Sequence, residues 1–135
     1  MTSIEYERSR TRMQWSLGIL ALAPTISGGQ QVVLGVAGTP GDSQVVSSTV
    51  DGELRYANVF KMVSGPIILS QLHDVEDSPI LTATLATVFV GGLARLLSWR
   101  RVGRPHPSAL VAIALELGAV PAALYWRRRL ASSRA

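Results

Sequence analysis

The sequence predicts an all-α integral membrane protein, a single domain of residues 1–135 built as a bundle of four membrane-spanning helices. The chain is 47% hydrophobic and only 16% charged, whereas a soluble domain carries roughly 25% charged residues. Long apolar runs, aromatic residues at their ends and arginines just outside them support the same class. The absence of cysteine excludes disulfides and thiolate metal sites.

Four apolar runs of 17–22 residues have the length of a membrane-spanning helix, which is about 20 residues. None of them alternates apolar and charged residues with the 3.6-residue period of a soluble surface helix. Tryptophan and tyrosine lie at the run ends, where the membrane interface favours them. The predicted spans are 15–36, 56–72, 80–99 and 108–126.

Polar segments connect these runs. Residues 37–55 form a loop, in which a short strand or hairpin at 44–50 is considered. Residues 73–79 form a tight acidic turn. Residues 100–107 form a basic turn whose two prolines are expected to end the third helix. A cleaved signal peptide is the alternative for the first run. The length of this apolar run and the acidic residues before the run favour a first membrane span instead.

Arginines near the span ends predict the orientation, because cytoplasmic loops are rich in basic residues. Seven arginines flank the side that holds both termini, and four flank the other side. We therefore expect both termini in the cytoplasm and the protein in the cell (inner) membrane. Arginines grouped beside apolar runs favour anchoring in lipid headgroups over a nucleic-acid groove. The expected partners are the lipid bilayer and a membrane protein or a second copy, and nucleic acid is not expected.

Three charged residues interrupt the apolar runs, namely Lys61, Arg95 and Glu116. At helical spacing, Arg95 shares a stripe with Gly91 and Ser98, and such small and polar stripes face other membrane helices. A lone charge in the middle of the bilayer costs at least ~2.5–3.5 kcal/mol. Because arginine cannot avoid this cost by losing its proton, we expect Arg95 to pair with Glu116, with Lys61 nearby.

This charged cluster has two interpretations. In the first, the ion pair fixes the helix register of a non-enzymatic accessory or interaction subunit. In the second, the cluster lines an extracytoplasmic pocket for a small polar molecule or a lipid headgroup. A dry, packed pair would favour the first and a water-accessible pocket the second, while a soluble helical bundle is a weaker third possibility. The cluster comprises Asp51, Arg55, Lys61, Arg95 and Glu116.

No catalytic or cofactor motif is present in the sequence. The glycine-rich GVAGTPG at 35–41 lacks the Gly-Lys-Ser/Thr ending of a phosphate-binding loop. No Gly-x-Ser-x-Gly nucleophile elbow occurs. In the predicted topology His73 and His106 lie on opposite sides of the membrane, so they cannot share a metal. We therefore expect no enzyme activity, no cofactor and no metal site.

Four short motifs lie in the last 80 or so residues: DGELRY at 51–56, GGLARLLS at 91–98, VGRPHP at 102–107, and LEL with a later proline at 115–121. On these motifs the chain, from Asp51 to Arg129, resembles the domain-of-unknown-function 4345 family of small bacterial four-span membrane proteins. The resemblance implies a membrane location and a four-helix fold, and it implies no activity. Lys61 and the HDVED turn at 73–77 depart from the family pattern. The positions that the resemblance marks are Asp51, Arg55, Gly91, Gly92, Arg95, Ser98, Gly103, Pro105 and Glu116.

Overall fold

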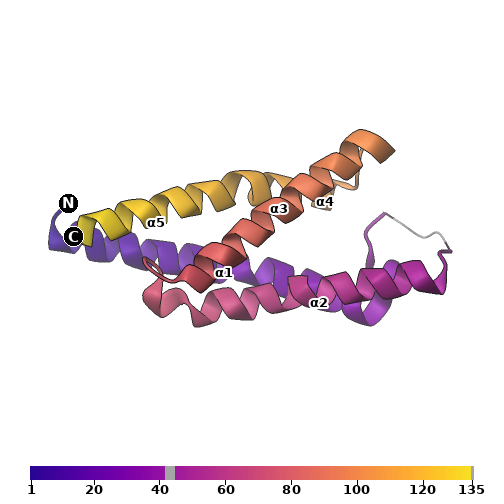
Figure 1. The fold of residues 1–135 in the computed structure, drawn as a ribbon, viewed down its shortest axis with the longest axis horizontal. Helices are drawn as coiled ribbons and strands as arrows, with labels where there is room; N and C mark the ends of the chain where they lie inside the picture. The colour runs from indigo at the N-terminus through magenta and orange to yellow at the C-terminus, as the bar shows by residue number, and fades with distance from the viewer. Residues whose placement is uncertain (42–44, 135) are drawn as a thin grey trace. The chain divides into compact units, whose positions relative to one another are not determined.

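The computed structural model describes residues 1–41 and 45–134, which form helices and no strand. The predicted all-α class is confirmed for this part of the chain. The helices belong to two compact units: Leu17–Ser70 is one, and Met1–Ser16 with Gln71–Ala135 is the other. We call them the Leu17–Ser70 unit and the terminal unit. The elements, in chain order, are α1 (Ser3–Leu34), η1 (Gly35–Gly38), α2 (Ser48–Ser70), η2 (Leu72–Asp74), α3 (Pro79–Val102), α4 (Pro107–Ala114), η3 (Leu115–Ala119) and α5 (Val120–Arg134) (Figure 1).

Three segments are long and apolar enough to cross a membrane, covering residues 3–38, 79–102 and 107–133. Much of their apolar surface is exposed, for example Trp15 at 70% and Val33 at 73%. Soluble proteins rarely leave so large and continuous an apolar surface in water. These helices therefore indicate a membrane protein, as the composition predicted.

The helix that covers the predicted second span, α2, carries charges along much of its length. α2 begins at Ser48, eight residues before the predicted span. It therefore includes Asp51, Glu53 and Arg55 in addition to Lys61, and every stretch of 18 residues in α2 holds at least three of these charges. For this reason α2 is not among the three segments that are long and apolar enough to cross a membrane.

The strand considered at residues 44–50 is wrong for its described part. Residues 45–47 have no regular structure, and residues 48–50 are the first turn of α2. Residue 44 lies outside the described residues. The Ser47 side chain accepts a hydrogen bond from the Val50 backbone N–H at 3.3 Å. A serine at this position stabilises the start of a helix, because it satisfies a backbone donor that has no partner inside the helix.

In the Leu17–Ser70 unit, α1 and α2 approach each other at glycines. A Cβ atom added to Gly65 would lie 1.8 Å from Thr25 Oγ1. A Cβ atom added to Gly28 would lie 2.6 Å from the backbone nitrogen of Met62. Neither position has room for a side chain. This close backbone contact is the packing that small residues permit between membrane helices.

In the terminal unit, α3 contacts α4, η3 and α5. The predicted inward stripe on α3 is partly wrong, because Gly91 and Ser98 are exposed whereas Leu81, Leu85 and Gly92 are buried. The prediction followed small and polar residues alone. Leucine side chains bury more apolar area than glycine or serine, so they determine which face of α3 turns inward.

The turn between α3 and α4 forms where the sequence predicted it. Gly103 follows the end of α3 with φ +124°, a conformation that favours glycine. α4 then begins at Pro107, whose ring suits the first position of a helix. Further along, η3 is a π-helical turn immediately before α5. Pro121 lies just beyond η3, and since it cannot bond to the carbonyl four residues back, a wider turn accommodates it.

Candidate functional site

Arg95 and Glu116 come together where α3 meets the π-helical turn η3. Arg95 Nε lies 3.1 Å from Glu116 Oε2, and the two side chains are 36% and 17% exposed. Gly92 lies almost one turn before Arg95, and a Cβ atom there would be only 2.8 Å from Glu116 Cβ. The missing side chain at Gly92 therefore lets η3 approach α3 closely enough for the pair to form.

A cavity of about 360 Å³ opens beside Arg95, at the end of α3 and the turn into α4. Its lining includes Arg95, Ser98, Gly103 and Pro105, which are four of the positions that the sequence motifs marked. Glu116 is not part of the lining. Arg95 therefore has two kinds of contact. It pairs with Glu116, and it also lines an open cavity.

The polar part of this cavity consists of cationic and hydroxyl groups. Arg104 joins Arg95 and Ser98 in the lining. Two threonines earlier in α3, Thr84 and Thr87, donate their hydroxyls to backbone carbonyls four residues before them. Within residues 1–41 and 45–134, by contrast, neither the Ser98 hydroxyl nor the Arg104 guanidinium has a hydrogen bond or an ion pair. These donors are therefore available to an anionic ligand.

The predicted cluster residues Asp51 and Arg55 lie in the Leu17–Ser70 unit, where they bond to backbone groups at the C-terminal end of α1 and just beyond it. Arg55 Nε donates to Asp51 Oδ2 at 2.7 Å, and its Nη1 donates to the carbonyls of Val32 and Val33 at 2.8 and 2.7 Å. Asp51 Oδ1 accepts from the Val36 backbone N–H at 2.9 Å. This arrangement satisfies carbonyls that the end of a helix leaves without partners.

Two further residues complete this helix end. Gly35 adopts φ +61°, and a Cβ atom on it would lie 2.0 Å from Asp51 Oδ1. Lys61 Nζ donates to Gln31 Oε1 at 3.2 Å. The five residues predicted as one cluster therefore belong to different units: Arg95 and Glu116 lie in the terminal unit, and Asp51, Arg55 and Lys61 in the other.

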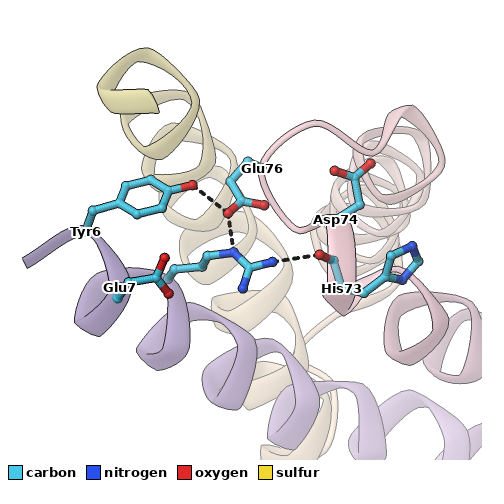
Figure 2. Close-up of a pocket in the computed structure, with 6 residues that line it drawn as sticks. Tyr6, Glu7, His73, Asp74 and Glu76 are labelled. Carbon is cyan, nitrogen blue, oxygen red and sulfur yellow. Dashed lines mark hydrogen bonds and ion pairs between the residues drawn. The ribbon is translucent and has the colours of Figure 1, made fainter. Parts of the chain in front are cut away.

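The sequence did not reveal a polar network between the N-terminal turns of α1 and the turn before α3. Glu76 Oε1 accepts hydrogen bonds from the Tyr6 hydroxyl at 2.7 Å and from Arg10 Nε (Figure 2). Arg10 also donates to the His73 carbonyl at 2.7 Å. Burial by itself would raise the pKa of Glu76. The hydrogen bonds from Tyr6 and Arg10 and the Arg10 charge outweigh burial, so the net pKa lies below the usual value.

An open cavity of about 420 Å³ lies over this network. Tyr6, Glu7, Asp74 and Glu76 surround it, together with His73 (Figure 2). Although several of these groups are acidic or imidazole, the described residues contain no group of three or more histidine, aspartate and glutamate side chains placed to hold a metal ion. The hydrogen bonds of Glu76 and Arg10 hold two chain segments together, which is a structural role.

Arg127 completes the same end of the terminal unit, and its position was predicted wrongly. The sequence placed it with the arginines in the lipid headgroups, but its side chain is buried and only 4% of the residue is exposed. It donates to the carbonyls of Val75 and Ser78 at 2.5 and 2.8 Å, and to Thr82 Oγ1 at 2.6 Å. A buried arginine fixes the turn because that turn supplies acceptors for most of its donors.

A signal for this burial was present in the sequence. Val120, Arg127 and Leu130 are seven and three residues apart, so they lie on one face of α5, and all three are buried. The prediction for the fourth span instead followed Glu116, the one charged residue inside that apolar run. Continuing the valine and leucine face would have included Arg127.

The fold and the site together define an all-helical membrane protein whose third and fourth apolar segments share an arginine–glutamate contact beside a cavity. The chain belongs to the family described as domain of unknown function DUF4345, whose model matches residues 12–127. This match confirms the resemblance found in the motifs and extends it to most of α1. No curated protein and no solved structure matches the chain.

Proposed function

We propose that the chain crosses the cell (inner) membrane four times, with both termini in the cytoplasm. The contacts in the terminal unit support an even number of crossings. Trp126 Nε1 donates to Ser9 Oγ at 2.8 Å, and Gln14 Nε2 donates to the Leu72 carbonyl at 2.8 Å. These contacts support a shared side of the membrane for the two terminal segments and the turn before α3.

This shared side requires a return path through α2. If α1 carries the chain away from Gln14 across the membrane, α2 must bring it back to Leu72. The 23 residues of α2 extend for about 35 Å at 1.5 Å per residue, which suffices for a ~30 Å hydrocarbon core. Because the chain has no cysteine, single cysteines can test the topology. One at Ser133 should react only from the cytoplasmic side and one at Ser108 only from the other side, and a shared side would disprove it.

The proposed role is non-enzymatic binding of a small polar molecule or a lipid headgroup in the cavity beside Arg95. One observation carries this proposal: four residues marked by the sequence motifs, Arg95, Ser98, Gly103 and Pro105, line a single cavity. The exposure of Arg95 supports it further, because a purely structural ion pair in lipid would be expected to lie dry and packed.

The second candidate role is that of an accessory or interaction subunit, in which the Arg95–Glu116 pair only fastens the helices. The close approach at Gly92 favours this role, since a Cβ atom there would lie 2.8 Å from Glu116 Cβ and 2.9 Å from Leu117 Cδ2. The two roles differ in what the purified protein should carry. A binding protein should retain a small molecule, whereas a subunit should retain a protein partner.

Native mass spectrometry of the full chain, extracted in a mild neutral detergent, tests the binding role. We expect the wild type to retain a bound small molecule and the Ala109→Trp variant to lose it, because Ala109 lines the cavity and tryptophan fills it. Ala114→Trp is the matched control, since Ala114 is exposed on the same helix and outside the lining. Equal retention by both variants, or no retained molecule in the wild type, would contradict this role.

A further inference from the structure

The charged groups in the lining of the cavity at the α3–α4 turn are all cationic. Arg95 and Arg104 line it, and no aspartate or glutamate does. The described contact of Arg95 with Glu116 is made through Nε alone, whereas a guanidinium offers five N–H donors. Arg104 has no ion pair or hydrogen bond within the described ranges, 1–41 and 45–134. The cavity is thus lined by two guanidinium groups that have N–H donors available for a ligand.

We propose that this cavity binds a phosphate-ester anion, held by Arg95 and Arg104 with a hydrogen bond from the Ser98 hydroxyl. The inference rests on the binding role proposed above and names the ligand class. Guanidinium groups match the geometry of phosphate oxygens and form charge-assisted hydrogen bonds to them. Ser98 supplies the neutral donor, because its hydroxyl is not bonded to the backbone of its own helix as those of Thr84 and Thr87 are.

The other walls of the cavity accept an apolar group beside the phosphate. These walls include Trp99, Val102, Ala109 and Ile113. Small-molecule sites combine an apolar wall with a few polar groups that orient the ligand, and tryptophan favours the membrane interface. A phosphate ester reaches such a site either as a phospholipid headgroup or as a soluble phosphate, and both sources present the same oxygens to the arginines.

The test uses the full chain in a neutral detergent with two probes. The first is dioleoyl phosphatidylglycerol in mixed micelles, and the second is glycerol 3-phosphate in the buffer. For the probe that binds, Arg104→Gln should lower the affinity at least ~10-fold, since it removes charge-assisted hydrogen bonds. Arg100→Gln is the matched control, because it removes the same charge close by without altering the lining. It should change the affinity less than about twofold.

Ser98→Ala is a second variant that keeps every charge, and it should weaken binding roughly threefold or more by removing one neutral hydrogen bond. Melting curves of all variants report whether they fold. Binding of either probe supports the proposal if Arg104→Gln and Ser98→Ala weaken it and Arg100→Gln does not, and the probe that binds identifies the source. Equal weakening by Arg104→Gln and Arg100→Gln would reveal general charge attraction and overturn the proposal, as would no binding.

The result for the purified protein separates this inference from the binding role. If the wild type retains a molecule without phosphate and Ala109→Trp loses it, the binding role stands and the phosphate-ester inference fails. If no small molecule is retained and neither probe binds, both fail.

Discussion

The two ends of the terminal unit use arginine in opposite ways. At one end Arg127 is 4% exposed, and its donors reach carbonyls of the turn before α3 and the Thr82 hydroxyl. At the other end the Arg95 side chain is 36% exposed, and its Nε contacts Glu116. Arg104, beside it, is exposed and lines a cavity.

Burial separates a structural arginine from one that is available for binding. A buried guanidinium must have its donors satisfied by the protein, because an unsatisfied buried charge costs several kcal/mol. An exposed guanidinium pays little for unused donors and can offer them to a ligand. On this criterion Arg127 belongs to the scaffold, whereas Arg95 belongs partly and Arg104 wholly to the proposed site. Arg55 is 40% exposed by its side chain and belongs to the scaffold for another reason, because Asp51 and the carbonyls of α1 already accept its hydrogen bonds.

The largest loss of stability is expected from Arg127→Leu. The substitution leaves the buried carbonyls of Val75 and Ser78 without their donor, which should lower the free energy of unfolding by about 3 kcal/mol or more. Arg128→Leu changes an exposed neighbour and should alter it by less than about 0.5 kcal/mol. Denaturant titration of the protein in detergent measures both. Equal effects of the two substitutions would contradict a structural role specific to Arg127.

A smaller effect is expected where α3 meets η3. In Gly92→Ala the new Cβ atom would lie 2.8 Å from Glu116 Cβ, so the helices must separate, at a cost of about 1–3 kcal/mol. Gly91→Ala is the matched control, because a Cβ atom there meets nothing within 4 Å. It should stabilise the helix by about 0.5–1 kcal/mol. Melting temperatures that fail to move in opposite directions would show that the close contact is not required.

The smallest of these effects is expected from Glu76→Gln, and it should depend on pH. The folded-state pKa of Glu76 lies below its ordinary value of 4.5. Its carboxylate therefore contributes stability that is fully present above about pH 4.5 and is lost as the pH falls through the folded pKa. The substitution should cost about 1–2 kcal/mol at pH 7 by weakening the bond to Arg10, and less in acid.

Glu53→Gln provides the comparison for Glu76, because Glu53 is exposed in the other unit. Melting temperatures measured from pH 7 down to about pH 3 should show the difference between Glu76→Gln and the wild type shrinking as the pH falls. A difference that stays constant over this range, or one that Glu53→Gln reproduces, would mean that the Glu76 carboxylate does not stabilise the turn.

Much of the fold was accessible from local patterns. The apolar runs predicted where helices occur, and the two prolines predicted the turn between α3 and α4. The cost of a lone arginine in lipid predicted a contact between Arg95 and Glu116, and Arg95 Nε lies 3.1 Å from Glu116 Oε2. These features depend on hydropathy, chain flexibility and charge. Each of these properties can be read from a residue and its neighbours in the sequence.

Three features of the protein follow from its sequence without the fold: the all-helical class, the apolar surfaces suited to a membrane, and the family to which the chain belongs. Tertiary structure decided what each arginine does. Arg127 and Arg104 both follow apolar runs in the sequence. The face that Arg127 shares with Val120 and Leu130 indicates that it is buried, but only the folded chain supplies its acceptors and leaves Arg104 beside a cavity. The physical reason is that the acceptors for a buried arginine come from residues about 50 positions away, such as Val75 and Ser78, and the sequence around Arg127 carries no record of them.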